Sequence, residues 1–372
     1  MRIAVNTRML LKHRMEGICR YIHETTRRMV EAHPEDEFIF FFDRPFHPSF
    51  IYGPNVTPVV IPPPTRDPIL WKIWFDYAIP RALKKYKADV FLSGDTYMSL
   101  KTDVPTVLVS HDIAYHHFPE HLPRRVLNYY RKCFPKFHQK AAHIIAVSEF
   151  TKQDIIKAYH LDPKKISVAY NAAPEGFSPF SYEEKVRVRN KFSYGKPFFI
   201  YVGSIHPRKN IKNMILGFQE FKKKGSDHNL IILGRKAWNF AEYEALMDSR
   251  KDIIWLDGNQ IDPREVLPAA EALIYVSLHE GFGIPILEAM RSDIPVITSK
   301  VSSMPEVAGD AAILVDPNSV FSIRDGFDHM TSSDEIVSMI QKSRKQVEKF
   351  SWDESAATIY DQIIKVKVKS KE

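Results

Sequence analysis

The sequence predicts an α/β protein built from two doubly wound units in tandem. Short apolar runs alternate with longer helix-like segments, a pattern that is typical of a parallel sheet wrapped by helices. The pattern occurs twice within 372 residues, a length that favours two domains over a single core. A segment rich in proline separates the two occurrences, so that each unit has its own set of strands.

The apolar runs mark the expected strands, because each has the length of a buried strand and is bounded by polar or turn residues. In the first unit they are IAV, FIFFF, DVFL, TVLV and HIIAV, at 3–5, 38–42, 89–92, 106–109 and 143–147. In the second unit they are FFIYVG, LIILG, IIWL, ALIYVS, PVIT and AILV, at 198–203, 230–234, 253–256, 272–277, 295–298 and 312–315.

The boundary between the units is expected in NAAPEGFSPF, residues 171–180, because its prolines, glycine and serine interrupt both periodicities. The sequence therefore predicts an N-terminal domain at 1–174 and a C-terminal domain at 175–349. Residues 350–372 are expected to form a terminal helix, in which Ser351 is the N-cap and Glu354 follows three residues later. Its residues at helical spacing are Ala356, Tyr360, Ile363 and Ile364.

The charge of the sequence is uneven along the chain. Residues 1–175 hold 25 Lys and Arg against 18 Asp and Glu, whereas residues 176–372 hold 27 of each kind, so the net charge of +7 lies entirely in the first half. Such an excess indicates an anionic partner, either a phosphorylated or lipid-linked acceptor or an acidic membrane leaflet. A solvated basic face explains it equally well. Nucleic acid is not expected as a partner, because no recognition helix, zinc finger or aromatic RNA-binding signature occurs.

The cytoplasm is the compartment expected from the sequence, with the inner face of the membrane as a peripheral location. Cys19 and Cys133 are too few cysteines for a disulfide framework, which fits a reducing compartment. No apolar run has the length needed to cross a bilayer, and the opening residues, MRIAVNTRML, enter a strand without a cleavable signal pattern.

The stretch EGFGIPILE, residues 280–288, predicts a ligand-binding turn between a buried strand and a helix. Gly281 and Gly283 allow a tight turn and a close backbone approach, and the proline after them suits the first turn of a helix. Helix-start amides favour phosphate, and ligands usually bind at the carboxyl edge of a parallel sheet. Glu288, expected in the first helical turn, would accept hydrogen bonds from ribose hydroxyls, while Glu280 would contact another part of the same ligand. An ordinary turn before a helix with a solvent-facing glutamate is the alternative.

A second turn of this kind, VGSIHPRKN, covers residues 202–210 and again joins a strand to a helix. Gly203 opens the turn, and Arg208 and Lys209 stand at its mouth, where two cations would neutralise a diphosphate without a metal. A basic loop at the start of a surface helix is the alternative interpretation.

Histidines gather after a strand of the first unit, in TVLVSHDIAYHHFPEH at 106–121. His111 and Asp112 come at the carboxyl end of the strand, a suitable place for a group that takes part in catalysis. The mixed spacing of the later histidines matches no standard ligand motif, so no metal is expected there. A fourth segment, residues 6–24, leads through a loop to Gly17, which would let the backbone approach a phosphate or an acceptor. It lacks GxGxxG, which argues against nicotinamide binding and against an oxidoreductase.

In this order, the four segments resemble the retaining glycosyltransferases of family 4, which have the GT-B fold of two Rossmann-like domains facing across a cleft. EGFGIPILEAM resembles the family's E-x7-E motif, GSIHPRKN its phosphate-binding turn, HDIAYHHFP its catalytic-histidine segment and MEGICRY its GGIGRY loop. SEFTKQDI and SSMPEVAGDAAILVDP, at 148–155 and 302–317, extend the similarity over nearly the whole chain. Glu16 and Cys19 stand where the loop usually has glycines, and Ser204 stands where many relatives have arginine.

The resemblance implies that the C-terminal domain binds a nucleotide-sugar donor and the N-terminal domain an acceptor, with the terminal helix packing back on the N-terminal domain. Glu288 would hold the ribose, Arg208 and Lys209 the diphosphate, and Glu280 the donor sugar. His111 would lie over the transferred sugar, so that His111 and Glu280 are the expected catalytic residues. The other implied donor-binding positions are Gly17, Gly203, Ser204, Gly281, Phe282, Gly283 and Ile284.

The reaction implied is a retaining hexosyl transfer without a cofactor or a metal, in which cations and helix-start amides stabilise the departing diphosphate. The PRKN turn, the His-Asp pair and SSMPEVAGDAA resemble bacterial mannosyltransferase-like members that build surface polysaccharide. GDP-mannose is therefore the expected donor, and a saccharide or a lipid-linked saccharide the expected acceptor. A UDP- or dTDP-sugar donor stays open, as does a non-catalytic protein that binds nucleotide sugars.

Residues 122–145 interleave six basic side chains with six apolar ones. This pattern predicts either a basic membrane-binding face with aromatic anchors or a core-packed helix with a basic exterior. The residues are Arg124, Arg125, Arg131, Lys132, Lys136 and Lys140 with Val126, Leu127, Tyr129, Tyr130, Phe134 and Phe137.

Overall fold

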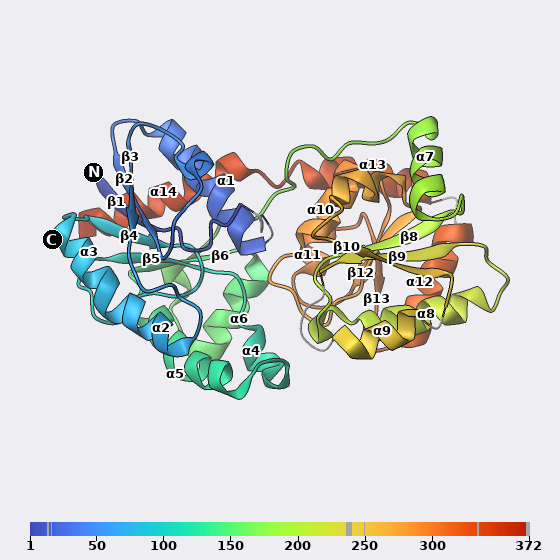
Figure 1. Cartoon of the computed structure of the whole chain (residues 1–372), viewed down its shortest axis with the longest axis horizontal. Helices are drawn as coiled ribbons and strands as arrows, with labels where there is room; N and C mark the ends of the chain where they lie inside the picture. Colours follow the sequence, from blue (N-terminus) through green and yellow to red (C-terminus); the bar gives the residue numbers. More distant parts are fainter. Residues whose placement is uncertain (13–14, 16, 236–239, 249, 333–334, 370–372) are drawn as a thin grey trace. The chain divides into compact units, whose positions relative to one another are not determined.

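The structure is a computed structural model that describes residues 1–12, 15, 17–235, 240–248, 250–332 and 335–369. Two compact units make up the chain, and each contains a parallel sheet with helices (Figure 1), which confirms the expected α/β class. Unit 1 comprises Met1–Asn171 and Ser351–Glu372, and unit 2 comprises Ala172–Phe350. Glu16, one of the departures in the loop before the first helix, lies outside the described residues.

Unit 1 contains a seven-stranded sheet in the order β3-β2-β1-β4-β5-β6-β7, with parallel pairing throughout. The strand order reverses between β1 and β4, and the carboxyl ends of these two strands therefore form a switch point, where doubly wound sheets bind their ligands. The strands are β1 (Arg2–Asn6), β2 (Glu37–Phe42), β3 (Val56–Val60), β4 (Val90–Ser93), β5 (Thr106–Ser110), β6 (His143–Ala146) and β7 (Ile166–Val168).

The two edge strands, β3 and β7, were not predicted from the sequence. β3 contains Pro58. Because proline has no amide hydrogen to donate to a neighbouring strand, a proline in the sequence argues against predicting a strand there. The proline is tolerated because β3 has one neighbour, β2, in the sheet. β7 has the sequence ISV, in which Ser167 interrupts the two apolar residues, so it does not form a continuous apolar run.

The terminal helix α14 packs against α1 within unit 1. The Ser351 hydroxyl accepts the amides of Asp353 and Glu354 at 3.2 and 3.3 Å, so Ser351 is the predicted N-cap. Ile364, which the spacing put on the apolar face, is 37% exposed, and Ile359 is buried instead because the helix turns that residue toward the sheet. The helices of unit 1 are α1 (Gly17–Ala32), α2 (Pro68–Ile73), α3 (Ile79–Lys85), α4 (Ala114–His117), α5 (Arg124–Lys140), α6 (Glu149–Tyr159) and α14 (Trp352–Lys369).

The aromatic side chains of α5 lie inside unit 1. Phe134 and Phe137 are buried, and Tyr130 stacks on Phe134 with ring centroids 4.3 Å apart. Tyr129 contacts Trp71 of α2 edge to face. The interpretation of these aromatic residues as membrane anchors is therefore wrong, because the helix uses its apolar face to close the core and leaves its basic residues outside.

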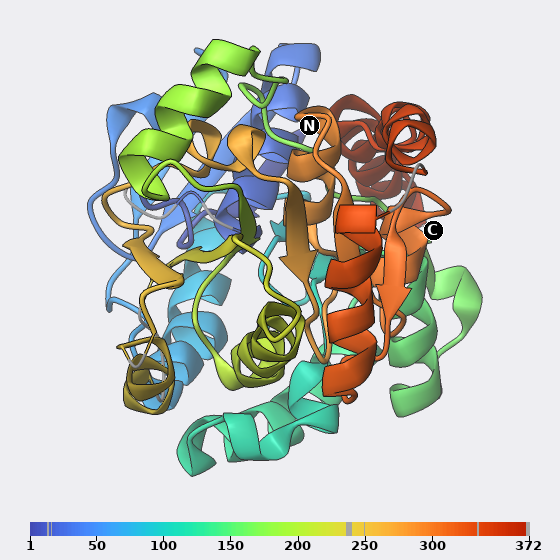
Figure 2. The same cartoon turned by 90° about the vertical axis from the view of Figure 1, so that its right-hand side faces the viewer.

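Unit 2 contains a six-stranded parallel sheet in the order β10-β9-β8-β11-β12-β13, with its switch point between β8 and β11. Figure 2 looks onto this unit, in which α8 and α12 pack against each other. The strands are β8 (Phe198–Val202), β9 (Asn229–Gly234), β10 (Ile253–Asp257), β11 (Ala272–Tyr275), β12 (Val296–Ser299) and β13 (Ile313–Val315). The helices are α7 (Tyr182–Phe192), α8 (Ile211–Lys222), α9 (Phe240–Asp248), α10 (Ile284–Arg291), α11 (Met304–Ala308), α12 (Val320–Ser332) and α13 (Ile336–Val347).

Candidate functional site

The switch point of unit 2 brings the two predicted turns together. β8 leads into the turn that ends in Pro207–Lys209, and β11 leads into the loop Glu280–Gly283 before α10. The amide of Leu278 donates to the carbonyl of Arg208 at 2.9 Å, which joins the two turns through their main chains. Side chains more than 70 positions apart in the sequence therefore meet at the carboxyl edge of one sheet.

Glycine is required by the backbone at both turns. Gly203 has a φ of 149°, and a Cβ atom there would lie 2.8 Å from the Tyr201 hydroxyl. Gly283 has a φ of 108° at the position just before α10. Gly203 sets the direction in which the first turn leaves β8, and Gly283 sets the direction in which the second turn enters α10. Any other residue at these two positions would be strained.

Arg208, Lys209 and Glu280 form one ion-paired cluster. The Lys209 ammonium lies 2.5 Å from Glu280 Oε1, and the Arg208 guanidinium lies 3.2 Å from Oε2. Arg208 also donates to the carbonyl of His279 at 2.5 Å, and Lys209 donates to the Tyr275 hydroxyl at 3.0 Å. The cluster holds two cations and one carboxylate and so carries a net positive charge beside the start of α10, which suits an anionic ligand.

The Glu280 carboxylate is 6% exposed and stays ionised. Burial alone would raise its pKa, but the adjacent Lys209 and Arg208 outweigh that effect and lower the pKa of Glu280 to about 2. Because the carboxylate is bound by both cations, the two turns are held together by charge as well as by the main-chain hydrogen bond.

The low pKa of Glu280 predicts that the folded protein loses stability in acid, as this carboxylate takes up a proton. A folded pKa below the ordinary 4.5 means that the stabilisation from Glu280 is complete above pH 4.5 and is lost as the pH falls toward 2. A difference of this size corresponds to about 3 kcal/mol at neutral pH. We expect the stability advantage of the wild type over Glu280→Gln, measured by denaturant unfolding, to shrink as the pH falls through this window. An advantage that does not change with pH would contradict the ion-paired state.

The loop from Glu280 to Gly283 is fixed by two serines that sequence reasoning did not single out as site residues. The Ser303 hydroxyl donates to the carbonyls of Glu280 and Phe282 at 2.9 and 2.8 Å, and the Ser302 hydroxyl accepts the amide of Glu280 at 3.1 Å. Both belong to the segment SSMPEVAGDAA, whose similarity to family 4 was the available signal. Tyr275 was also missed, because a buried tyrosine in a strand looks like core in a sequence.

Glu288 lies further into its helix than the sequence suggested. Since α10 begins at Ile284, Glu288 is the fifth helical residue and belongs to the second turn. The expectation of a first-turn position is wrong because the helix begins directly after Gly283, so that Pro285 is already its second residue and Glu288 comes one turn after the start. Glu288 is half-buried, and its charge acts on the guanidinium of Arg264, which follows β10 at the same edge of the sheet.

In unit 1, His111 follows β5 directly and is half-buried. Its Nε2 atom lies 2.8 Å from the carbonyl of Gly94, and burial lowers the pKa of His111 from the ordinary 6.5. His117 does not join it but lies 2.8 Å from Asp154 of α6. Gly17 begins α1 with a φ of 45° and is exposed. Across the described part of the chain, no group of three or more His, Cys, Asp or Glu side chains is arranged to hold a metal ion.

Family models match both parts of the chain. Residues 15–175 match the model of Glycosyltransferase Family 4, and residues 183–348 match that of Glycosyl transferases group 1. An O-antigen chain mannosyltransferase B from Escherichia coli is 28% identical, over 84% of this chain and 86% of its own. The O-antigen chain mannosyltransferase RfbU from Salmonella typhimurium is 31% identical, over 68% of this chain and 67% of its own.

Solved structures share the fold. WaaG, a glycosyltransferase involved in lipopolysaccharide biosynthesis, superposes with a TM-score of 0.78 at 15% identity, covering 97% of this chain and 99% of its own. The HepE protein of Anabaena, solved in complex with UDP and glucose, superposes with a TM-score of 0.74 at 14% identity, covering 98% of this chain and 100% of its own. Both comparisons extend over the two units.

Proposed function

Because the chain belongs to the family 4 glycosyltransferases, we propose that it transfers mannose from GDP-mannose to a saccharide or lipid-linked saccharide acceptor in surface polysaccharide synthesis. The ion-paired cluster of Arg208, Lys209 and Glu280 at the unit 2 switch point is the observation that carries this proposal. The mannosyl donor is supported by the relatives, two of which are named as O-antigen mannosyltransferases.

The chemistry proposed is a retaining transfer that needs no metal. Arg208 and Lys209 stabilise the negative charge that grows on the departing diphosphate, and each well-placed donor contributes about 2.7 to 4 kcal/mol. Glu280 keeps both cations in place before the donor binds and contacts the transferred sugar afterwards. Glu288 binds the ribose, and His111 contacts the transferred sugar in the transition state.

The donor is tested with a panel of GDP-, UDP- and dTDP-sugars, measured by thermal shift and by donor hydrolysis. We expect GDP-mannose to give the largest shift and the fastest turnover, because binding to the folded state alone raises its stability. If UDP- or dTDP-sugars give the largest shift instead, the assignment as a glycosyltransferase stands, but GDP-mannose is not the donor. Stabilisation by NAD without any effect of nucleoside diphosphates would overturn the transferase itself, and binding of every donor without hydrolysis or transfer would favour a non-catalytic protein.

We also propose that unit 1 binds an anionic membrane surface, through a face other than the aromatic residues of α5. Residues 68–85 form one helical run of α2, a π-helical turn at Trp74–Ala78 and α3. On this run Ile69, Ile73 and Tyr77 are 60%, 41% and 52% exposed. Exposed basic residues accompany them, namely Lys72, Arg81, Lys84 and Lys85. These seven residues are called the α2–α3 surface below.

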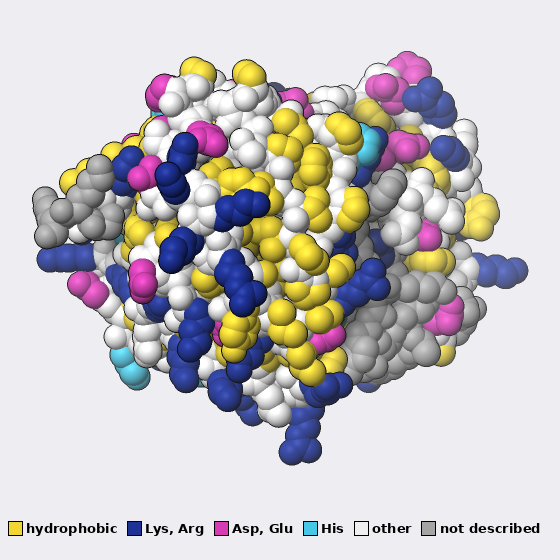
Figure 3. All heavy atoms as spheres, turned by 60° about the vertical axis from the view of Figure 1, so that its left-hand side comes forward, with side chains coloured by type: hydrophobic (Ala, Val, Ile, Leu, Met, Phe, Trp, Pro, Cys, Tyr) yellow, Lys and Arg dark blue, Asp and Glu magenta, His cyan; other side chains and the backbone are white. Residues whose placement is uncertain are grey.

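Basic residues outnumber acidic ones around the α2–α3 surface, where the acidic residues of the same segment are Asp67 and Asp76. α5, which contacts α2, adds six exposed basic residues and contains no Asp or Glu. Figure 3 brings forward the side on which Figure 1 places α3, and Lys and Arg side chains there surround apolar ones. Apolar residues among many cations match the chemistry of an anionic lipid surface. No helix within the described ranges is both long and apolar enough to cross a bilayer.

The membrane proposal predicts that co-sedimentation with vesicles requires anionic lipid and weakens with salt. We expect Lys84→Gln with Lys85→Gln to lower vesicle binding about tenfold or more, since each cation near such a surface is worth about 1 kcal/mol. Ile69→Ser with Ile73→Ser should weaken binding as well. Phe321→Ser is the matched control, because Phe321 is 60% exposed on α12 of unit 2. Equal binding to neutral and anionic vesicles would contradict the proposal.

A further inference from the structure

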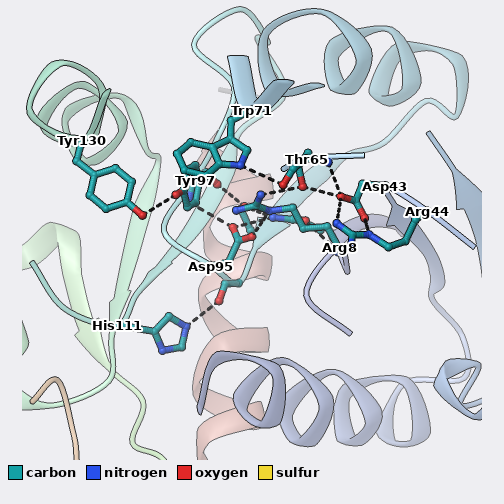
Figure 4. Close-up of polar contacts among 12 residues, drawn as sticks. Arg8, Asp43, Arg44, Thr65, Trp71, Asp95, Tyr97, His111 and Tyr130 are labelled. Carbon is teal, nitrogen blue, oxygen red and sulfur yellow. Dashed lines mark hydrogen bonds and ion pairs between the residues drawn. The ribbon is translucent and has the colours of Figure 1, made fainter. Parts of the chain in front are cut away.

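The switch point of unit 1 also carries a buried Arg–carboxylate pair. The Nε atom of Arg8, just after β1, lies 2.5 Å from Asp95 Oδ2, just after β4, and the two side chains are 6% and 1% exposed. The Arg8 guanidinium lies over the Tyr97 ring, 4.4 Å from its centroid. Figure 4 shows the pair at the centre of a network that continues through Thr65 to Asp43 and Arg44.

Asp95 is held from three directions. Besides Arg8, the amide side chain of Asn6 donates to Asp95 Oδ1 at 2.8 Å, and the main-chain amide of Tyr97 donates to it at 3.3 Å. Both carboxylate oxygens are therefore used, and the residue is fixed between the ends of β1 and β4. Its two chain neighbours, Gly94 and Thr96, are fixed with it.

These two neighbours are the residues that hold His111. Nε2 of His111 lies 2.8 Å from the Gly94 carbonyl, which is an acceptor only, so Nε2 carries the proton and Nδ1 of the neutral ring keeps its lone pair. The His111 amide donates to the Thr96 hydroxyl at 3.4 Å. The Thr96 amide donates to the Val109 carbonyl at 2.9 Å, which ties the same loop to β5.

The loop of residues 94–96 is under strain and tightly packed. Thr96 has a φ of 71°, a left-handed conformation that a β-branched residue adopts at a cost of about 1 to 3 kcal/mol. A Cβ atom at Gly94 would lie 2.6 Å from Ile22 of α1, so the backbone there is packed directly onto a helix. A left-handed threonine persists only where its surroundings enforce that conformation. Here the contacts of Asp95, the residue before Thr96, hold the loop in place.

We propose that Asp95, clamped by Arg8 and Asn6, is a positioning residue of the transferase that fixes the tautomer and orientation of His111 through Gly94 and Thr96. The inference rests on the proposed function, in which His111 contacts the transferred sugar. In this arrangement the proton of His111 points into the protein and the Nδ1 lone pair is available to a substrate. A free imidazole would exchange between both tautomers and between several orientations, so fixing one of them preorganises the site.

The groups that face the His111 ring come from three segments: α1, the loop after β4 and the loop after β5. Tyr21 of α1 contacts it edge to face at 5.2 Å, the Gly94 carbonyl accepts its proton, and the charges of Asp95 and Asp112 act on it. Asp95 therefore acts on His111 in two ways: through the loop that it holds and through its charge, which favours the protonated ring.

The test compares Asp95→Asn with Asp43→Asn in the full chain. Asp43 belongs to the same network and is bound by Arg44 and Thr65, but it does not touch residues 94–96. We expect Asp95→Asn to lower kcat about 10- to 100-fold with little change in the donor KM, because displacement of a reacting group acts mainly on the chemical step. Asp43→Asn should keep kcat near the wild-type value, although its melting temperature falls by about as much as that of Asp95→Asn.

A spectroscopic readout separates positioning from stability. In protein labelled with ¹⁵N-histidine, the His111 signals, assigned by their loss in His111→Gln, should report a proton on Nε2 in the wild type and in Asp43→Asn. In Asp95→Asn they should report a mixture of tautomers or a lower pKa. Unchanged His111 signals in a folded Asp95→Asn, or parallel activity losses in both variants, would overturn the proposal. The tautomer is read without any donor, so a failure of the transferase assignment is seen separately as absent turnover in the wild type.

Thr96→Gly supplies a second variant in case Asp95→Asn does not fold. Glycine adopts the left-handed conformation without strain, so the variant should fold with a melting temperature close to that of the wild type. The variant lacks the hydroxyl that accepts the His111 amide, and its loop is less constrained. We therefore expect a lower kcat and altered His111 signals. Wild-type kcat and signals in Thr96→Gly would also overturn the proposal.

Discussion

Glu280→Gln is expected to lose transfer activity by about 100-fold or more while it binds the nucleoside diphosphate at least as tightly as the wild type does. The amide preserves the size of the side chain but removes the charge that holds Arg208 and Lys209 in place. Because two partly buried cations then lack their counter-ion, the variant should also be less stable by about 3 to 5 kcal/mol. A bound diphosphate supplies the missing negative charge. The thermal shift caused by the nucleotide should therefore be larger in Glu280→Gln than in the wild type.

The matched control for this prediction is Glu271→Gln. Glu271 also pairs with an arginine in unit 2, Arg189, at 2.5 Å, but it precedes β11 and so belongs to the opposite edge of the sheet. We expect this control to keep transfer activity and the wild-type thermal shift. Full transfer activity in Glu280→Gln, or a smaller nucleotide shift than in the wild type, would refute the role given to the cluster.

His111→Ala is expected to lower kcat by about 10²- to 10⁴-fold and to leave donor binding in unit 2 unchanged. Since burial lowers the pKa of His111 from 6.5, the ring is neutral at pH 7. If the neutral ring is the active form, the rate should be flat above pH 6.5 and fall in more acidic solution as the ring takes up a proton. Steady-state kinetics across this range, with thermal shift by the donor, measures both effects.

His117→Ala provides the comparison for His111, because it removes an imidazole from the same segment after β5. His117 is bound to Asp154 on the exterior of unit 1, and its side chain is 36% exposed. We expect its loss to leave kcat near the wild-type value. Equal losses in both variants would indicate a general effect of the segment on folding, and no loss in His111→Ala would remove His111 from the mechanism.

The central strands and the two site turns were predictable from the sequence because they depend on local signals. A buried parallel strand is a short apolar run, and a turn that approaches a ligand needs glycines at fixed positions. The runs at 38–42 and 106–109 therefore became β2 and β5, and Gly203 and Gly283 took the backbone conformations that glycine favours. The edge strands β3 and β7 escaped prediction, since an edge tolerates proline and short length that a central strand does not.

The direction of the α5 aromatic side chains was not determined by the sequence. Basic and aromatic residues at helical spacing are compatible with a membrane face and with a core face. Only packing against Trp71, Tyr97 and neighbouring rings selected the core. Conversely, the exposure of Ile69, Ile73 and Tyr77 on the helical run at 68–85 became visible only when the structure placed that run at the surface.

The sequence by itself determined the α/β class, most strands and the family to which the chain belongs, because these rest on local periodicity and short motifs. Tertiary structure alone decided which charges meet. Arg208 and Glu280 are 72 positions apart, and Arg8 and Asp95 are 87 apart, yet each pair lies where the strand order of a sheet reverses. A sequence pattern records which residues lie on a strand or a turn, whereas the order of the strands in the sheet decides which strand ends, and therefore which side chains, become neighbours.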